Sequence, residues 1–427
     1  MPGDDADADD LRGPEQLTMS ARRAVVSAAI VLAFVASLSD CKKKPKADPV
    51  DVPAVVAPRG DFERGHALVA EFECNRCHDD AGLAAAPIEK HCVHCHQEIM
   101  AGTYDAPKAT LAKWQKIIVD LRDAPSLGET SARLRRSWIE KFLLDPHDLR
   151  PHLSATMPRL AITQQQARDI ATYFASEDEA PVALGALDEV RGKALFAAKG
   201  CATCHAFSGA PAATAMPIPV PVANLARAMA LAPDLRHTRD RFRRDNLAAW
   251  IADPSSIKPD TTMPTIPMTR DEARTLAAYI VRVAIAPIAP DAAVSRLPVL
   301  ARKVTWDEVS TKVFRNTCWH CHGEPEYAVG DGGPGNTGGF GFKGRGLNVA
   351  EYEGIASGAL DDDGQRRSIF AAMDGGSSRL VRALLARRGE ERGENDATMR
   401  GMPLGLPSLS PEDLQLVESW IAQGRPR

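Results

Sequence analysis

The sequence of 427 residues lacks several features that would point to common protein classes. Aromatic residues make up only 5% of the chain, so its side chains offer few large rings for building a core. Neither charge sign dominates: residues 1–40 carry three basic and seven acidic side chains, and the rest carries 49 of each sign. Without a basic patch, nothing in the composition indicates nucleic-acid binding.

Cysteine is also uncommon, but it is used in a regular way. Eight of the nine cysteines fall into four copies of Cys-x-x-Cys-His, a pattern typical of covalent haem c attachment. The two thiols bond to one porphyrin, and the histidine that follows lies under the iron as its proximal ligand. The cysteine pairs are Cys74 and Cys77, Cys92 and Cys95, Cys201 and Cys204, and Cys318 and Cys321, and the histidines are His78, His96, His205 and His322. The sequence therefore predicts four covalent haem c groups.

Other roles for paired cysteines fit this pattern less well. A zinc site needs four converging ligands; the first two copies are close enough in sequence for that, but the third and fourth are isolated. A disulfide framework gives no reason for a histidine after every second cysteine. A thioredoxin-like redox motif would occur once, near a βαβ pattern.

The ninth cysteine, Cys41, follows an apolar run. Residues 24–38 contain no charge, but these 15 residues are fewer than the ~20 that a spanning helix needs. With Arg22 and Arg23 before it, the run fits an export signal, and the sequence up to Cys41 resembles a bacterial lipoprotein signal. Asp40 departs from that pattern, since a small residue is usual there. We expect a signal segment at 1–41, lipid on Cys41, and a Lys- and Pro-rich linker at 42–60. An uncleaved membrane anchor is the alternative.

Two stretches of the chain repeat. Gly65 and Gly192 each lie nine residues before the first cysteine of a motif, in short amphipathic segments. Further along, Met157-Pro158 and Met263-Pro264 are each followed six residues later by a threonine and sixteen residues later by a tyrosine. The threonines begin the capping boxes Thr163-x-x-Gln166 and Thr269-x-x-Glu272, which predict the starts of helices. Met402-Pro403 precedes a similar helix start at Ser410-Pro411.

A haem motif near an N-terminal helix, then a Met-Pro loop, then a C-terminal helix resembles class I cytochrome c. The resemblance covers residues 61–180, 189–284 and 304–424, and the third of these stretches resembles the planctomycete-type cytochrome c variant. It implies a mainly α fold, with three class I cytochrome c-like all-α domains in tandem wrapped around covalent haems. We place these domains at 61–180, with the second haem site inserted, at 181–290 and at 291–427.

The resemblance also implies Met157, Met263 and Met402 as distal iron ligands of the first, third and fourth haems. A thioether ligand is soft and raises the haem potential relative to a second histidine. The proline after each methionine biases it away from helical backbone. Rival methionines are Met216, Met268 and Met399, and packing in a core is the alternative role for each methionine.

The second motif has no repeat of its own, so its distal ligand stays open. The candidates are His66, His91, Met100, His147 and His152, and an iron with an open position is also conceivable.

Two other segments are given structural roles. We expect residues 330–346, rich in glycine, to be a flexible loop at a haem edge, and the charged run 386–396 to be a solvated helix end.

The leading hypothesis is a periplasmic, membrane-tethered tetrahaem cytochrome that carries electrons between a redox donor and a redox acceptor. Haems with two protein ligands have no open position, so they exchange electrons and do little bond chemistry. The alternative is a di-haem peroxidase-like enzyme, or the cytochrome subunit of a periplasmic dehydrogenase, with the second haem open. We identify no catalytic residue in the sequence. The expected partners are a redox donor protein, a redox acceptor protein and a membrane, which the lipid on Cys41 would enter.

Overall fold

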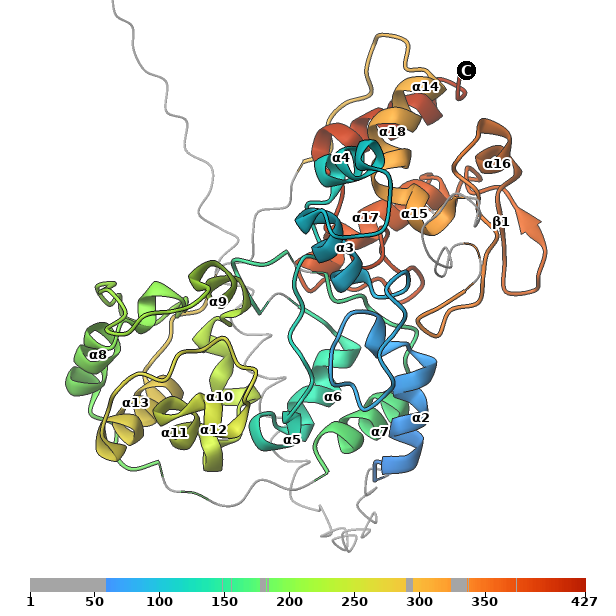
Figure 1. The fold of residues 1–427 in the computed structure, drawn as a ribbon. Coiled ribbons are helices and arrows are strands. Elements are labelled where there is room, and N and C mark those ends of the chain that lie inside the picture. The colour runs from blue at the N-terminus through green and yellow to red at the C-terminus, as the bar shows by residue number, and fades with distance from the viewer. Residues whose placement is uncertain are drawn as a thin grey trace, which may run out of the picture. The chain divides into compact units, whose positions relative to one another are not determined.

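The computed structural model describes residues 59–427 except 148, 155, 177–181, 183, 289–294, 324–335, 337 and 374. The predicted signal segment, Cys41 and nearly all of the linker lie outside these residues. The described chain is mainly helical, as predicted (Figure 1). Below, residues 61–180, 181–290 and 291–427 are called the first, second and third segments.

The first segment contains α2 (Phe62–Glu71), η1 (Cys74–Arg76), α3 (Cys92–Ala101), α4 (Lys108–Ile117), α5 (Thr130–Arg133), α6 (Arg136–Leu144) and α7 (Gln164–Phe174). The second contains α8 (Glu189–Ala198), η2 (Cys201–Thr203), α9 (Leu225–Leu231), η3 (Leu235–His237), α10 (Thr238–Arg241), α11 (Arg244–Ala252), α12 (Pro254–Ile257) and α13 (Arg270–Arg282). The third contains α14 (Trp306–Val309), η4 (Ser310–Cys318), α15 (Trp319–His322), α16 (Tyr352–Ser357), β1 (Ala359–Leu360), β2 (Arg366–Arg367), α17 (Arg379–Glu391) and α18 (Pro411–Ala422). β1 and β2 form an antiparallel pair.

The first and last helices of the first two segments pack directly on each other, and glycine makes this possible. α2 contacts α7, and α8 contacts α13. A Cβ on Gly65 would lie 2.2 Å from the carbonyl oxygen of Asp169, and one on Gly192 would lie 2.5 Å from Cβ of Tyr279. No other residue fits where two helix backbones approach so closely. The repeated glycine and tyrosine therefore meet at equivalent helix crossings.

The C-terminal helices begin where the sequence predicts. Thr163 and Thr269 form complete capping boxes at the starts of α7 and α13. Ser410 accepts a hydrogen bond from the backbone of Asp413, with Pro411 in the first turn of α18. The predicted caps are therefore confirmed. They can be predicted from the sequence because a cap depends only on neighbouring residues.

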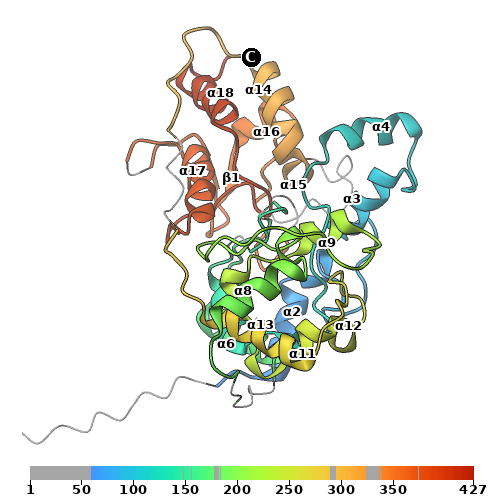
Figure 2. The ribbon, with the colours of Figure 1, turned by 90° about the vertical axis from the view of Figure 1, so that its left-hand side faces the viewer.

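Each segment has its own buried cluster. α2, α6 and α7 enclose the cluster of the first segment, which includes Val69, Phe72 and Ile170. α8, α11 and α13 enclose that of the second, which includes Leu276 and Tyr279. In the third segment α14, η4, α17 and α18 lie together (Figures 1 and 2) around the fully buried Trp420. A smaller cluster of Cys95, Ile99 and Leu111 joins α3 to α4.

The prediction for 386–396 is wrong in part, since its first half is buried. Arg387, Arg388 and Glu390 are 5%, 7% and 4% exposed. Arg387 Nε donates to the carbonyl oxygen of Leu406 at 2.8 Å, and Arg388 Nη2 donates to that of Leu409 at 2.8 Å. Glu390 accepts from the backbone nitrogen of Gly401 at 2.8 Å. These charges fix the Met402 loop, a role that the local sequence pattern does not reveal.

The third segment also contacts the first segment. Arg159, which follows Met157-Pro158, forms an ion pair of 3.2 Å with Glu390. Phe340, from the described part of the glycine-rich segment, donates its backbone N–H to Glu73 at 3.1 Å. The Arg76 guanidinium lies 5.1 Å from the centre of the Phe340 ring. The described part of this segment therefore packs beside the first haem motif.

Among the described residues, no helix has the length and apolar character needed to cross a bilayer.

We predict that Trp420→Ala destabilises the haem-loaded protein by about 3–5 kcal/mol. Trp420 is 0% exposed, and its ring lies 5.6 Å from those of Trp306 and Phe370. Val299→Ala is the control, because Val299 is 52% exposed and its change should stay within about 0.5 kcal/mol. Denaturant unfolding followed by circular dichroism measures both, and equal losses would contradict the predicted core.

Candidate functional site

The first attachment motif lines a cavity of about 180 Å³. Cys74 and Cys77 reach it from η1 and its end, His78 follows directly, and Met157 reaches it from the loop before α7. The remaining wall is largely apolar and comes mainly from α6, α7 and the preceding loops. The structure thus brings the predicted proximal and distal ligands of the first haem to one cavity.

The third motif lines a second cavity, of about 380 Å³. Cys201, Cys204 and His205 line it, and so does Met263 from the loop between α12 and α13. Of the rival methionines, Met268 packs on the hydrophobic cluster of the second segment, and Met216 is 45% exposed. Neither is among the residues that line this cavity.

Three of the four predicted proximal histidines make the same hydrogen bond. Nδ1 of His78 lies 2.7 Å from the carbonyl oxygen of Pro125, Nδ1 of His96 lies 3.0 Å from that of Asp120, and Nδ1 of His205 lies 2.9 Å from that of Pro233. A carbonyl can only accept, so Nδ1 carries the proton and Nε2 keeps its lone pair. Metal-binding histidines are commonly oriented in this way.

Burial favours the neutral form of these histidines. It lowers the pKa of His78, His96 and His205, and it lowers the pKa of His322 to about 4. A neutral imidazole is the form that binds iron. Nδ1 of His322 is buried without a hydrogen-bond partner among the described residues.

The fourth motif lies at the junction of η4 and α15. Cys318 and Met402 both pack against the cluster around Trp420. The backbone N–H of Met402 donates to the carbonyl oxygen of Ala383 in α17 at 2.9 Å, which anchors the loop. Cys318 and the predicted distal Met402 therefore border the same cluster.

The cysteine thiols are unsuited to thiolate chemistry. Burial raises the pKa of Cys74 and Cys318 to about 12, and that of Cys95 and Cys201 to about 11. Redox-active cysteines and zinc ligands act as thiolates and occur where the pKa is lowered. This disfavours the dithiol redox alternative.

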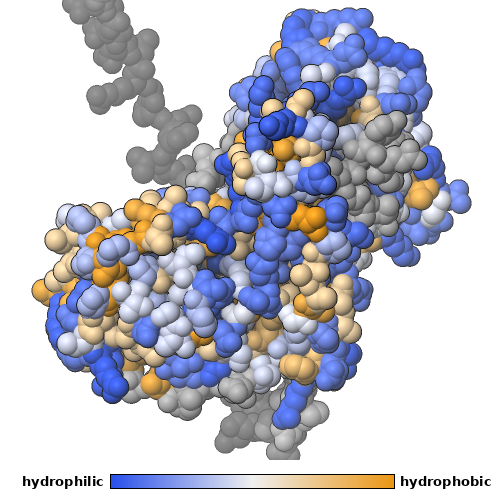
Figure 3. Space-filling view, viewed as in Figure 1, coloured by the Kyte–Doolittle hydropathy of each residue, from blue (hydrophilic) through white to orange (hydrophobic). Residues whose placement is uncertain are grey.

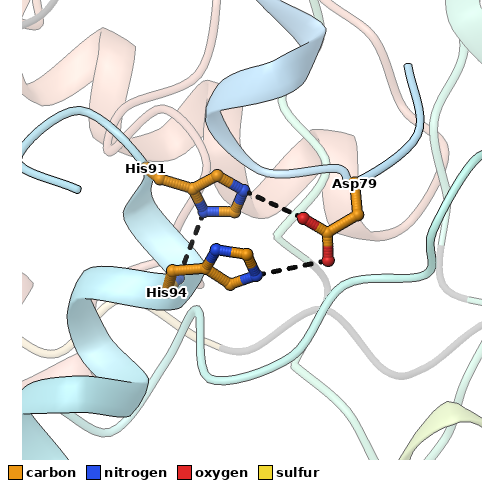
Figure 4. A group of neighbouring side chains, drawn as sticks. All are labelled: Asp79, His91 and His94. Atoms are coloured by element: carbon orange, nitrogen blue, oxygen red, sulfur yellow. Dashed lines mark hydrogen bonds and ion pairs between the residues drawn. The ribbon is translucent and has the colours of Figure 1, made fainter. Parts of the chain in front are cut away.

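The first and second motifs lie against each other. Cys77 makes a side-chain hydrogen bond with Cys92, and this bond, followed by burial, raises the pKa of Cys77. Close by, His91 and His94 stack with their ring centres 3.8 Å apart, and both face Asp79 (Figure 4). His91 Nε2 lies 3.4 Å from one oxygen of Asp79, and His94 Nε2 lies 3.2 Å from the other.

Two histidines and a carboxylate can bind a divalent metal, but the hydrogen bonds here disfavour it. Nδ1 of His91 accepts from the backbone N–H of His94 at 3.1 Å and caps α3. Its lone pair is therefore on Nδ1, and in the neutral ring Nε2 carries the proton. Nε2 of His91 then points N–H, not a lone pair, toward Asp79. This is the reverse of the arrangement at His78, His96 and His205, so we interpret the cluster as a polar contact that joins the two motifs.

The other candidates for the second haem's distal ligand are dispersed. His66 Nε2 contacts the carbonyl oxygen of Gly82, His147 lines the first cavity, and His152 is exposed. Met100 lies in the last turn of α3, the helix that carries the second motif itself. None of these positions favours one candidate, and the distal ligand stays unassigned.

Six residues line both cavities: Ala124, Pro125, Ser126, Arg133, Arg150 and Arg241. We call them the shared wall. Arg133 and Arg241 are each 8% exposed, and Nε of Arg241 is buried without a partner among the described residues. Haem is a large apolar ring with two carboxylates, so apolar cavities with buried guanidinium groups fit it well.

Sequence reasoning missed these arginines, although a signal exists. Arg133-Leu134-Arg135-Arg136 and Arg241-Phe242-Arg243-Arg244 repeat one pattern just before α6 and α11. It also missed the carbonyl acceptors of Pro125 and Pro233, because a backbone acceptor leaves no mark in the sequence.

Residues 189–284 match the family model of cytochrome c. The second segment therefore contains a cytochrome c domain, which implies covalently bound haem c and haem-based electron transfer. The match has the same bounds as the resemblance seen in the sequence, and it includes Cys201, Cys204, His205 and Met263. A search of curated proteins and a search of solved structures gave no match.

We predict that Met263→Ala removes the sulfur-to-iron charge-transfer band of the third haem and lowers its potential, because a thioether ligand favours ferrous iron. Met263 lines the cavity of the third motif. Met216→Ala and Met268→Ala are the controls. Visible spectra and redox titration of the oxidised protein measure the effect. Loss of the band in Met268→Ala instead would move the ligand to that sulfur.

Proposed function

We propose that this protein is a membrane-tethered, periplasmic c-type cytochrome with four haems in three tandem cytochrome c domains, carrying electrons between a donor and an acceptor protein. Each haem supplies a one-electron iron couple. The chain's own residues hold it covalently, fix the proximal imidazole and keep water from the iron.

One observation carries the proposal: the repeated hydrogen bond from Nδ1 of a motif histidine to a backbone carbonyl. It presents the Nε2 lone pair at three separate motifs, in His78, His96 and His205. At two of them the side chain of a Met-Pro methionine lines the same cavity. An iron held between imidazole and thioether has no open position, which suits electron transfer more than bond chemistry.

The placement of the motifs supports transfer within the chain. The first motif contacts the second through Cys77 and Cys92 and shares a cavity wall with the third. The loop after Met157 contacts the loop before Met402, because Arg400 Nη1 donates to the carbonyl oxygen of Arg159 at 3.2 Å. We infer that the first haem is the branch point through which the other three exchange electrons.

An exposed apolar surface near the third motif supports docking of a redox partner. Met216, whose carbonyl accepts from Thr203 Oγ1 inside the motif, is 45% exposed. Val190 and Leu225 are 83% and 40% exposed. Figure 3 shows hydrophobic residues over this region, around α8 and α9. Exposed apolar side chains beside a haem attachment motif suit brief contacts with a redox protein.

We expect intact mass and haem staining of denatured protein to give four covalent haems per chain. Replacing Cys92 and Cys95 together with serine should remove one haem and leave three. Replacing Cys201 and Cys204 is the matched control and should also remove one. Three haems in the wild type, with no change in the Cys92/Cys95 variant, would show that the second motif binds none.

The spin state separates a carrier from an enzyme. An electron carrier should have all its haems low-spin in the ferric protein, because each iron would have two protein ligands. A high-spin quarter that disappears in the Cys92/Cys95 variant would favour the peroxidase-like alternative, with an open iron at the second site.

Cys41→Ser should release the protein from membranes or leave it unprocessed, with every haem still attached. Acyl chains contribute about 0.8 kcal/mol per buried methylene group, so a multiply acylated cysteine anchors firmly. Membrane fractionation, N-terminal sequencing and haem staining test this. A wild type that begins elsewhere and washes off in salt would overturn the lipid anchor.

A further inference from the structure

Two backbone segments cross at the shared wall in an almost symmetric way. Leu134 and Phe242 form an isolated antiparallel bridge. The backbone N–H of Arg135 donates to the carbonyl oxygen of Arg241 at 2.9 Å, and that of Arg243 donates to the carbonyl oxygen of Arg133 at 2.8 Å. The bridge therefore fixes the side chains of Arg133 and Arg241 relative to both cavities.

Each of these arginines stacks on the segment opposite its own. The Arg133 guanidinium lies 5.7 Å from the ring centre of Trp250 in α11, and that of Arg241 lies 5.4 Å from that of Trp138 in α6. Trp138 lines the first cavity, and Trp250 lines the second. Each arginine therefore stacks on a tryptophan of the other segment.

The positive charges of Arg133 and Arg241 are only partly compensated by the described residues. Burial lowers the pKa of Arg241 well below its usual value, and repulsion from Arg150 and Arg133 lowers it further. Arg133 donates to the carbonyl oxygens of Glu129 and Gly128, which carry no charge. Asp260 and, more weakly, Glu129 favour the charged form of Arg133. The two carboxylate oxygens of Asp260, however, also bind Lys258 Nζ at 2.6 and 2.7 Å. Buried charges of one sign are costly unless an opposite charge is supplied.

We propose that Arg133, Arg150 and Arg241 form one anion site shared by the first and third haem sites, and that it binds a propionate carboxylate from each haem. Arg150 completes the cluster; its Nε donates to the carbonyl oxygen of Leu231 at 3.0 Å, and the side chain lines both cavities. The proposal rests on the haem-binding function proposed above. Planar guanidinium groups match carboxylates in bidentate geometry, and they are more weakly hydrated than an ammonium group.

A shared site couples the two haems. Ferric haem carries one more positive charge than ferrous haem, so nearby arginines favour reduction and raise the potential. Because each arginine borders both cavities, removing one charge must lower both potentials.

Two variants test this on the full haem-loaded chain: Arg133→Gln and Arg241→Gln. At a fixed solution potential, each should reduce the ratio of reduced to oxidised iron about tenfold in both haems, a shift of about 59 mV for a one-electron couple. Redox titration followed by visible spectra measures this. A Met263→His background separates the third haem from the first, since a second histidine lowers its potential.

Two controls distinguish charge from structure. Arg239→Gln removes a positive charge from the same helix, α10, but Arg239 donates to Ile280 and Val283 and is not among the residues that line either cavity. Its effect on both potentials should be clearly smaller. Arg133→Lys and Arg241→Lys keep the charge and should restore most of each potential, which a purely structural role would not explain.

The outcomes are separable. A shift in only one haem for each variant would overturn the shared site, and unshifted potentials with all haems bound would overturn the anion site. Absence of haem from the wild type would instead overturn the proposed function. If the glutamine variants do not fold, Arg150→Gln takes their place, because Arg150 lines both cavities and is less buried. Both potentials should fall in this variant, and unshifted potentials with all haems bound would overturn the anion site.

Discussion

The orientation of the imidazole in the predicted proximal histidines is the constraint on which the candidate sites depend. A histidine can present a lone pair at Nε2 only if its other nitrogen carries the proton, and a buried backbone carbonyl enforces this. For His78 and His205 the carbonyls belong to Pro125 and Pro233, residues far along the chain that also line the cavities. One hydrogen bond therefore closes each cavity and selects the tautomer. His91, with its hydrogen bond reversed, shows how the same side chain serves a different purpose one residue before a haem motif.

Buried charge organises the contacts between the segments. Glu390 and Arg159 pair across the first and third segments, and the arginines of the shared wall lie between the first and second. The two cases differ in energy. The Glu390 pair has both signs and several hydrogen bonds, so loss of one partner would leave a buried charge at a cost of about 3–5 kcal/mol. The shared wall contains three arginines and no acidic residue, and the proposed propionate carboxylates would supply the opposite charge.

The sequence predicts what depends on neighbouring residues. The caps at Thr163, Thr269 and Ser410 and the cytochrome c domain at 189–284 follow from short patterns. The repeated glycine is visible in the sequence, but its reason, a helix crossing against Asp169 or Tyr279, needs the packing. The polar pattern of the charged run from residue 386 predicts exposure to solvent. Its arginines are nevertheless buried and donate hydrogen bonds to backbone carbonyls of the Met402 loop. Contacts between segments and backbone acceptors carry no local signal, so the shared wall appears only in three dimensions.

The hydrogen bond between Cys77 and Cys92 has a consequence for how the protein matures. If both motifs hold haem, as we propose, these neighbouring sulfurs would bond to two different porphyrins. Loading one motif would then place a large rigid ring beside the other. The two attachment steps would therefore not be independent, and the order in which the first two motifs receive haem would affect how easily the second is loaded.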